Sequence, residues 1–483
     1  MSALVAAPVL VPLATAGIAV LAARRPQLQE RISLLGGLAF LACAVALVML
    51  AAADQPVRGS FGGWVAPFGI EFHLDRTGAV LVLITALMGA ASLLFLLSDA
   101  DAGSRHPLLL PLVHGVLAGV GGAFSTADLF NLYVWFEVML ICALGLFAIG
   151  GRIDQLDASY KYLVLNLLGT LILLMAVGAV YGATGHLNYT ALSQSAASMP
   201  TALTVVLLTA LLLAFLIKAG AFPLYAWLPA SYHTLPAPVL ALFAGLLTKV
   251  GVYAVLRTLG DVFAPAPEVL LEALGWVAVA TMLFGVLGAA YHWDMRRILA
   301  FHIVSQIGYI LLAIALSGDA GNAAALFYTV HHIIVKANLF LIAAMVWRLT
   351  GSYDLRRIGG LYRERPLLGV LFLVPALSLV GVPPLSGFWA KLLVLQEALD
   401  QGRYLWTAAA LLVSVLTLYS MMKIWMEGFW KKHPDDGWQL PVDTRLANAW
   451  LVTVGLAGIT LLIGLNPQPL VEYAQAAARG LGG

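Results

Sequence analysis

Long, nearly uninterrupted apolar runs make up most of the chain, and polar residues are confined to the short stretches between them. A membrane-spanning helix needs about 20 predominantly apolar residues, and runs of that length recur from one end of the sequence to the other. The pattern therefore predicts an all-α membrane protein with about fourteen transmembrane helices. The predicted spans lie near residues 2–23, 32–53, 77–97, 107–125, 129–150, 159–183, 202–232, 236–259, 268–291, 296–317, 322–348, 366–400, 405–429 and 445–465.

Two of these runs, 202–232 and 366–400, are too long for one straight span. Both contain helix breakers, Pro223 in the first and the stretch 381–384 (Gly-Val-Pro-Pro) in the second, because proline removes a helix hydrogen bond and clashes with the preceding turn. The broken sequence at 222–227 is also echoed at 384–389, five helices later. Because five is an odd number, two consecutive five-helix units lie in the membrane with opposite orientations, as in many transporters. We therefore predict two inverted five-helix repeats with broken seventh and twelfth spans.

The predicted spans divide the chain into four parts. An N-terminal three-helix segment, with an external hairpin at 54–76, is followed by two repeats and a C-terminal helix with a short tail. The predicted boundaries of these parts are 1–106, 107–259, 268–429 and 445–483.

Composition and charge support this reading. The chain is 61% hydrophobic and 10% charged, whereas a soluble domain carries about 25% charged residues. Basic residues outside the spans gather on one side, which the positive-inside rule identifies as the cytoplasm. The expected cytoplasmic residues are Arg24, Arg25, Arg31, Arg105, Arg152, Lys161, Arg296, Arg297, Arg348, Arg356, Arg357, Arg363, Arg365, Lys431, Lys432 and Arg445. Those on the opposite side are Arg58, Arg76, Arg257, Arg403 and Arg479. We expect a multi-pass protein of the bacterial plasma membrane with both termini outside.

Several classes of function are disfavoured by the same sequence. The net charge of +2 and the lack of a basic run argue against nucleic-acid binding. Cys43 and Cys142 are isolated within apolar runs, and no phosphate-binding GxxxxGK[ST] loop is present. We expect no cofactor, no metal site and no covalent catalysis, which favours an ion transporter over an enzyme.

The residues that suggest a function are charges inside the spans, each of which costs about 2.5–3.5 kcal/mol at the bilayer centre. They include Glu137, Lys218, Lys249 and Lys391, and two of these lysines lie next to the helix breaks. Desolvation disfavours a buried ammonium while a nearby carboxylate stabilises it, so such lysines can exchange protons near neutral pH. Glu137 is the expected partner of Lys218. The alternative is a set of static interhelical salt bridges.

The eleventh predicted span contributes His331, His332 and Lys336. His332 and Lys336 are four residues apart and share a helix face, and histidine titrates closest to physiological pH, so the group suits a relay between lysines. A structural role for the histidine pair remains the alternative. For His302 we expect a packing role, and for Lys423 we expect snorkelling or a local ion pair with Glu427.

Residues 215–229 (FLIKAGAFPLYAWLP), together with the glutamate-bearing helix before them, resemble the antiporter-like subunits of respiratory complex I. Within that superfamily, the stretches 158–166, 181–188 and 245–253 are most similar to the D-type subunits of the Mrp multisubunit Na⁺/H⁺ antiporters. The resemblance implies fourteen helices, inverted five-helix repeats and broken seventh and twelfth helices. It also implies, as partners, other membrane subunits of the same complex, with protons and Na⁺ as the transported ions.

The resemblance places the family's functional positions on residues already selected because they lie inside apolar spans: Glu137, Lys218, Lys249, His331 or His332, and Lys391. The predicted proton pathway comprises Glu137, Lys218, Lys249, His331, His332, Lys336 and Lys391. An overlay of the two halves puts Gln306 where the second half could have matched Glu137, so the halves differ.

We therefore predict a proton-translocating subunit of a Na⁺/H⁺ antiporter. The alternatives are a proton-pumping membrane subunit of a complex I-like or hydrogenase redox complex, and a non-transporting assembly scaffold.

Overall fold

The computed structural model describes residues 4–53, 55, 57–60, 64, 69–97, 106–435, 437, 438 and 446–481. Arg105 and Arg445, two residues of the expected cytoplasmic side, lie outside this range. In the described chain, twelve helices are long and apolar enough to cross a membrane, and Leu109–Ser125 and Pro366–Val380 are shorter apolar helices. The predicted all-α membrane fold is thus confirmed.

The helices follow the predicted apolar runs closely. The long helices are α1 (Ala7–Leu21), α2 (Pro26–Ala52), α3 (Arg76–Leu96), α4 (Leu109–Ser125), α5 (Leu129–Ala148), α6 (Ile153–Thr184), α8 (Thr201–Ala219), α10 (Ala237–Arg257), α11 (Glu268–Tyr291), α12 (Met295–Leu316), α13 (Gly318–Thr350), α15 (Pro366–Val380), α16 (Ser386–Asp400), α17 (Tyr404–Ile424) and α18 (Ala447–Leu465). The short elements are η1 (Leu4–Ala6), β1 (Val57–Ser60), β2 (Glu71–Leu74), α7 (Tyr189–Ala196), α9 (Trp227–Ser231), η3 (Tyr232–Thr234), η4 (Thr258–Val262), α14 (Leu361–Glu364), η5 (Trp425–Trp430) and α19 (Gln468–Arg479).

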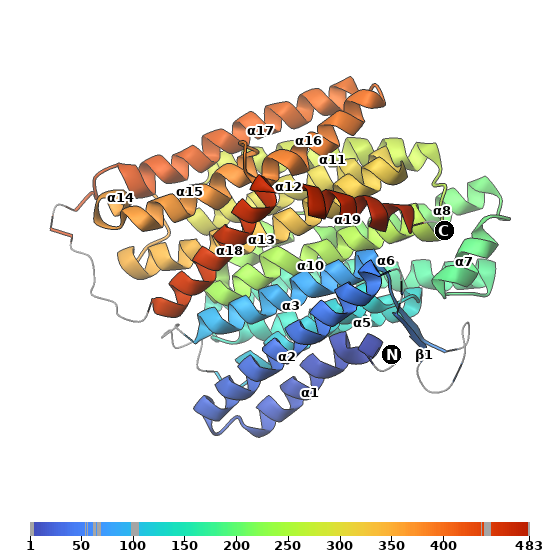
Figure 1. The fold of residues 1–483 in the computed structure, drawn as a ribbon, viewed down its shortest axis with the longest axis horizontal. Helices are drawn as coiled ribbons and strands as arrows, with labels where there is room; N and C mark the ends of the chain where they lie inside the picture. Colours follow the sequence, from blue (N-terminus) through green and yellow to red (C-terminus); the bar gives the residue numbers. More distant parts are fainter. Residues whose placement is uncertain are drawn as a thin grey trace.

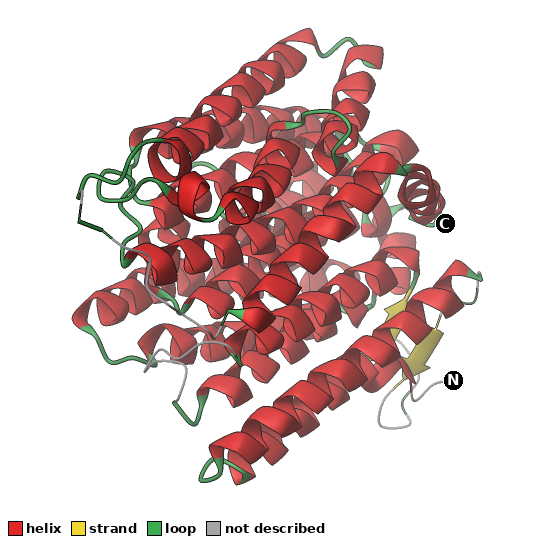
Figure 2. Ribbon diagram, turned by 60° about the vertical axis from the view of Figure 1, so that its left-hand side comes forward, coloured by secondary structure: helices red, strands yellow, loops and turns green. Residues whose placement is uncertain are grey.

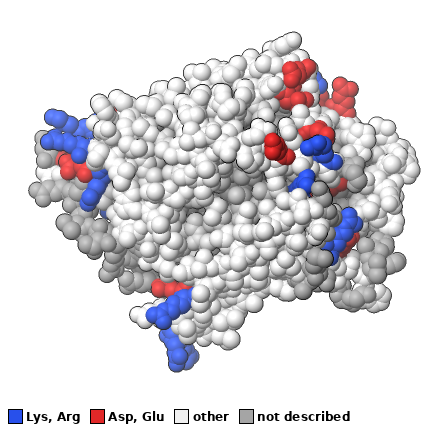
Figure 3. Space-filling view, in the orientation of Figure 1, with Lys and Arg blue, Asp and Glu red and all other residues white. Residues whose placement is uncertain are grey.

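The helices lie side by side along a common direction, with α10, α12 and α13 in the interior (Figure 1). These three helices bury nearly every side chain, whereas α2, α6 and α17 keep large apolar residues such as Leu35, Leu171 and Leu412 exposed. An exposed apolar belt is what a lipid environment requires. On the face drawn in Figure 3, charged side chains gather near the ends of the helices and leave a broad uncharged belt between them.

Both chain termini lie at the same end of the helical body (Figure 1). The strands β1 and β2, which Figure 2 shows at this end, pair antiparallel with Val57 opposite Leu74. They fall within the expected hairpin 54–76, of which residues 54, 56, 61–63 and 65–68 are outside the described part. The C-terminal helix α19 packs on α13 and α3, and the Tyr473 hydroxyl donates a hydrogen bond to the Arg76 carbonyl over 2.9 Å.

The two predicted helix breaks are present. Helix α8 ends before Gly220, which adopts the left-handed conformation with φ of +74°, and helix α15 ends before Gly381 at +98°. Glycine occupies this region without the steric cost that other residues meet, so each helix stops there. Pro223 and Pro384 follow three residues later, and the chain resumes helical structure in α9 and α16. Both breaks thus have the same local construction.

Candidate proton-transfer site

Lys218 lies in the last turn of α8, directly before the first break, and is buried. Its Nζ donates hydrogen bonds to the Asn166 carbonyl over 2.9 Å and to the Thr170 hydroxyl over 2.7 Å. Both acceptors belong to α6. The ammonium also lies 5.6 Å from the centre of the Phe136 ring, within the range of a cation–π contact. Lys218 is therefore held by neutral groups on α5 and α6.

Glu137 follows Phe136 on α5 but does not form a direct ion pair with Lys218. No N–O distance between the two is within 4.0 Å, although the carboxylate is close enough for its charge to act on Lys218. Glu137 is half-buried, and its Oε1 has no hydrogen-bond partner in the described chain. A small cavity between Phe136, Tyr162 and Lys218 has about 20 Å³ of room for the centres of water molecules. That volume accommodates a single water molecule.

The middle of the predicted pathway is formed by α10 and α13. Lys249 and Lys336 are both fully buried and lie within electrostatic range of each other. Lys249 donates to the Ala244 carbonyl over 2.5 Å, and Lys336 donates to the Leu299 carbonyl over 3.2 Å. His332 lies within electrostatic range of Lys336, with which it shares a helix face, and also of Lys249. The structure therefore brings these three residues together.

Lys391 lies on α16 after the second break and packs directly against it. A side-chain carbon added at Gly381 would lie 2.9 Å from the Lys391 Cδ. The Lys391 Nζ donates to the Val380 carbonyl over 2.7 Å and to the Ser414 hydroxyl of α17 over 3.0 Å. It also lies 4.8 Å from the centre of the Tyr309 ring.

His331 faces this second break rather than the central lysines. Its Nδ1 lies 2.8 Å from the Ser386 hydroxyl, at the first residue of α16. Ser386 in turn lies 3.0 Å from the Ser378 hydroxyl of α15, which also accepts the Gly387 N–H over 3.1 Å. Hydrogen bonds among Ser378, Ser386 and His331 thus connect α15, α16 and α13 at the second break.

The static salt-bridge interpretation does not match this geometry. None of Lys218, Lys249, Lys336 and Lys391 forms an ion pair with a carboxylate anywhere in the described chain. Several polar atoms near them also lack a protein partner there, among them both ring nitrogens of His332 and the amide nitrogen of Gln306. Buried polar groups usually have a hydrogen-bond partner, and these atoms have none among the described protein groups.

Two peripheral predictions have different outcomes. His302 hydrogen-bonds the Ser420 hydroxyl over 2.6 Å, a contact of the kind expected for a packing residue. Of the two roles expected for Lys423, the ion pair with Glu427 is wrong. Lys423 instead donates to the carbonyls of Ala290 and His292, which end α11, and Glu427 pairs with Lys431 at 2.5 Å.

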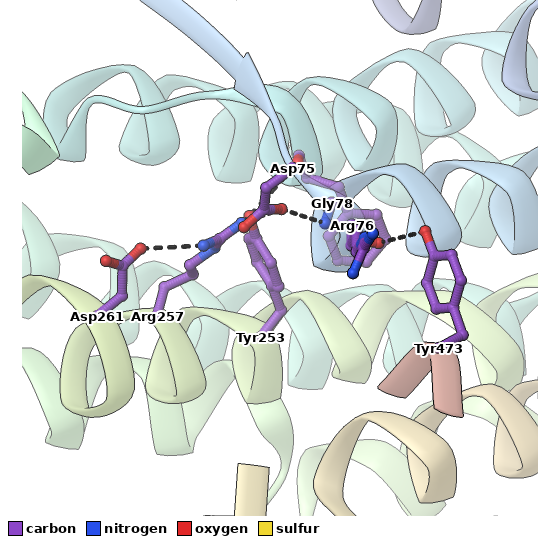
Figure 4. Close-up of polar contacts among 8 residues, drawn as sticks. Asp75, Arg76, Gly78, Tyr253, Arg257, Asp261 and Tyr473 are labelled. Atoms are coloured by element: carbon purple, nitrogen blue, oxygen red, sulfur yellow. Dashed lines mark hydrogen bonds and ion pairs between the residues drawn. The ribbon is translucent and has the colours of Figure 1, made fainter. Parts of the chain in front are cut away.

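Among the described residues, the largest buried ion-pair group lies outside the predicted pathway (Figure 4). It lies at the end of the body that carries the termini (Figure 1). Arg257, in the last turn of α10, bridges Asp75 at 2.5 Å and Asp261 at 2.9 Å. Its Nε donates to the Tyr253 hydroxyl over 2.9 Å. Burial alone would raise the pKa of Asp75, but the charge and hydrogen bond of Arg257 hold that pKa below its ordinary value. This group fastens α10 to the start of α3.

A polar hollow of about 500 Å³ lies beside α9, the short helix that follows the first break. It is lined by Asp154, Asp157, Lys161, Tyr225, Ala226, Pro229, Ala230, His233, Thr234, His292, Arg297 and Phe301. Burial and the nearby Arg297 and Arg296 lower the pKa of His233, in η3, to about 4. That imidazole is therefore neutral at physiological pH. In the described chain, no group of three or more His, Cys, Asp or Glu side chains is placed to hold a metal ion.

Comparison with known proteins agrees with this architecture. The family model described as NADH:quinone oxidoreductase/Mrp antiporter, TM, matches residues 126–417. The D-type subunit of the Na⁺/H⁺ antiporter of Alkalihalophilus pseudofirmus is 37% identical over 481 residues, covering 99% of this chain and 97% of that protein.

Two solved structures have the same fold over almost their whole length. A chain in the structure of the Mrp complex from Dietzia sp. DQ12-45-1b is 36% identical, with a TM-score of 0.91 over 100% of this chain and 98% of that chain. A chain of the membrane-bound sulfane sulfur reductase, an archaeal respiratory membrane complex, is 27% identical, with a TM-score of 0.91 over 98% and 97%. The chain therefore belongs to the NADH:quinone oxidoreductase/Mrp antiporter family of membrane subunits, and within it to the group of D-type Na⁺/H⁺ antiporter subunits.

Proposed function

We propose that this protein is the proton-translocating subunit of a multisubunit monovalent cation/proton antiporter, with Na⁺ as the exchanged cation. It works with other membrane subunits of that complex in a bacterial plasma membrane, with both of its termini outside. It is a secondary ion transporter that performs no covalent chemistry. The proposed proton pathway comprises Glu137, Lys218, Lys249, His331, His332, Lys336 and Lys391.

The observation that carries this proposal is the set of four buried lysines bonded only to neutral oxygens. A purely structural lysine in a membrane interior is expected to pair with a carboxylate, because an unpaired buried charge is expensive. Lysines without such partners are free to change protonation state when a neighbouring charge changes. Adding a proton at Lys249 disfavours one at Lys336, since like charges repel. A change in protonation at one lysine can therefore alter the protonation of the next lysine.

Access for protons is the second requirement. The polar hollow beside α9 lies next to the first break, and its lining residue Ala226 is adjacent to Trp227, which lines the small cavity at Lys218. Arg297 and Lys161, in the same hollow, belong to the side that the charge distribution assigns to the cytoplasm. We propose this hollow as the cytoplasmic approach to Lys218. The two five-helix units, 107–259 and 268–429, would then each contribute one end of the pathway.

The test is cation-dependent proton movement in inverted membrane vesicles, without an electron donor, comparing the intact complex with Lys218→Ala. Assembly is checked by co-purification, and Lys432→Ala, at an exposed lysine, is the matched control. Loss of the Na⁺-driven pH gradient in an assembled Lys218→Ala complex, with the control unchanged, is the expected result. Full exchange in Lys218→Ala would overturn the assignment of this residue.

The two alternatives predict different results in the same assay. A redox-driven pump, suggested by the likeness to a chain of a respiratory membrane complex, gives no Na⁺-driven exchange in the intact complex and moves protons only when an electron donor is supplied. A non-transporting scaffold gives normal exchange even after joint substitution of Lys218, Lys249 and Lys391.

A further inference from the structure

The four pathway lysines differ in the chemistry of their hydrogen-bond partners. Lys249 and Lys336, in the middle, bond only to backbone carbonyls. Lys218 and Lys391, beside the two breaks, each bond to one carbonyl and one side-chain hydroxyl. The hydroxyls belong to Thr170 of α6 and Ser414 of α17. The same pairing therefore occurs at both breaks, on unrelated stretches of sequence.

A hydroxyl can do what a carbonyl cannot. A lysine ammonium has three donors and no acceptor, and a carbonyl oxygen only accepts, whereas a hydroxyl both donates and accepts. When the lysine loses its proton, the nitrogen gains a lone pair that can accept a hydrogen bond. A neighbouring carbonyl has no hydrogen to donate to it. A neighbouring hydroxyl can rotate its hydrogen toward the nitrogen and keep the contact.

The surroundings leave both hydroxyl hydrogens available for that rotation. Thr170 makes no hydrogen bond in the described chain other than the one from Lys218, which also takes the Asn166 carbonyl one turn earlier on α6. A threonine in a helix ordinarily bonds that carbonyl. Ser414 lies 2.8 Å from the Tyr309 hydroxyl and 3.1 Å from the Ala410 carbonyl. When Lys391 is charged, the Ser414 hydroxyl can therefore donate its hydrogen to either of these two oxygens.

Tyr309 completes the arrangement at the second break. Its hydroxyl donates to the Ala410 carbonyl over 2.5 Å, which leaves its oxygen free to accept from Ser414. With Lys391 charged, the hydrogen bonds run from Nζ to Ser414 and on to Tyr309. With Lys391 neutral, Ser414 turns its hydrogen toward Nζ. The titratable groups that face Lys391 are Tyr309, His331 and His302.

We propose that Thr170 and Ser414 are matched positioning residues, each keeping the lysine beside a helix break hydrogen-bonded in both its charged and its neutral state. The inference rests on the proposed proton-translocating function, and it separates the two lysines at the breaks from the two in the middle. Removing either hydroxyl leaves the neutral lysine without a donor, and the exchange rate falls because one of its two states is disfavoured.

The experiment measures Na⁺-driven proton movement in inverted vesicles holding the whole complex, with assembly checked by co-purification. Thr170→Val and Ser414→Ala each lower the exchange rate by about tenfold or more, the factor that corresponds to leaving the buried nitrogen of the neutral lysine without a hydrogen-bond donor. The conservative variants Thr170→Ser and Ser414→Thr retain the hydroxyl and restore the rate to within about twofold. A merely structural contact would instead lower the yield of co-purified complex together with the exchange rate.

The matched controls are Thr209→Val on α8 and Thr417→Val on α17, whose hydroxyls bond only the preceding turn of their own helix. Both controls keep the exchange rate. If Ser414→Ala does not assemble, Thr170→Val carries the test on the other side of the molecule. Full exchange in assembled Thr170→Val and Ser414→Ala complexes, with Lys218→Ala inactive, overturns this inference and leaves the proposed function standing. Full exchange in Lys218→Ala instead overturns the proposed function itself.

Discussion

His331 and His332 are consecutive residues of α13, yet they face different parts of the proposed pathway. His331 bonds Ser386 at the second break, with Nδ1 2.8 Å from the hydroxyl, whereas His332 lies within electrostatic range of Lys249 and Lys336. Successive residues of a helix point about 100° apart, so neighbours in the chain meet different helices. The adjacent histidines therefore lie between the central lysines, Lys249 and Lys336, and the second break.

This division predicts a specific pattern of coupling. Ser386→Ala and His331→Ala remove the two halves of one contact, so the double variant loses little more exchange activity than the worse single one. Ser386→Ala and His332→Ala act on separate contacts, so their losses multiply. Contacting residues typically couple by about 0.5–3 kcal/mol, whereas independent sites add within about 0.5 kcal/mol. Exchange rates of the assembled single and double variants measure both couplings. Equal coupling of Ser386 to the two histidines would contradict the division.

The second break also predicts a steric effect at Gly387, in the first turn of α16. A side-chain carbon there would overlap the Ser378 carbonyl oxygen and lie 2.9 Å from the His331 Cε1. Gly387→Ala therefore forces α15, α16 and α13 apart, at a cost of about 1–3 kcal/mol for overpacking. Thermal unfolding of the purified complex measures the loss of stability.

The control for this substitution is Gly458→Ala on α18, where an added carbon would meet nothing within 4 Å. We expect Gly458→Ala to be neutral or slightly stabilising, because alanine favours helix more than glycine does. If both variants unfold at the same temperature as the unaltered complex, the break is not packed as tightly as the structure indicates.

The sequence was sufficient to predict the membrane fold and the charged members of the site. Apolar runs of spanning length determine the helices, and the proline and glycine positions 220–223 and 381–384 mark the breaks. Charges such as Lys249 are conspicuous because they are rare within apolar runs. The pathway as a route for protons stays a prediction, as do the repeats and the domain boundaries.

Hydroxyl groups were missed for a physical reason. Serine and threonine in helices usually bond a carbonyl of their own preceding turn, as Thr417 bonds Val413. Nothing local distinguishes Thr170 or Ser414 from such residues, because their partners come from distant helices. The same limit explains the wrong pairing of Lys423, whose partners Ala290 and His292 end another helix. Helix α19 was missed because it is short and amphipathic.

The ion-pair group at the outer end of α10 predicts a pH-dependent loss of stability. Arg257→Gln leaves Asp75 buried without its cation, and breaking a buried pair in this way costs about 3–5 kcal/mol. In the intact protein the folded pKa of Asp75 lies below its ordinary value. Its contribution to stability is therefore present above the unfolded pKa, near 3.8, and is lost as pH falls through the lower folded pKa.

In Arg257→Gln the sign reverses, because burial, the largest influence on Asp75, then raises its pKa. The variant is destabilised most at neutral pH, and the difference from the unaltered complex shrinks as the solution is acidified. Melting temperatures at pH 7 and pH 5 measure this trend. Adding Asp75→Asn removes the unpaired charge and recovers part of the stability. A deficit that does not change with pH would show that Asp75 is not the group responsible.

Substitution of Glu137 is expected to change the exchange rate without changing the stability of the complex. Its Oε1 has no hydrogen-bond partner in the described chain, and no ion pair joins it to Lys218. Glu137→Gln keeps the shape of the side chain and removes only its charge and its ability to bind a proton. We expect an unchanged melting temperature, since no bond is lost, and a fall in exchange on the order of 100-fold, as for a lost proton donor or acceptor. Glu272→Gln is the control, because Glu272 pairs with Arg403 at 2.5 Å away from the pathway and its loss leaves exchange intact. A destabilised Glu137→Gln complex with normal exchange would instead identify Glu137 as a structural residue.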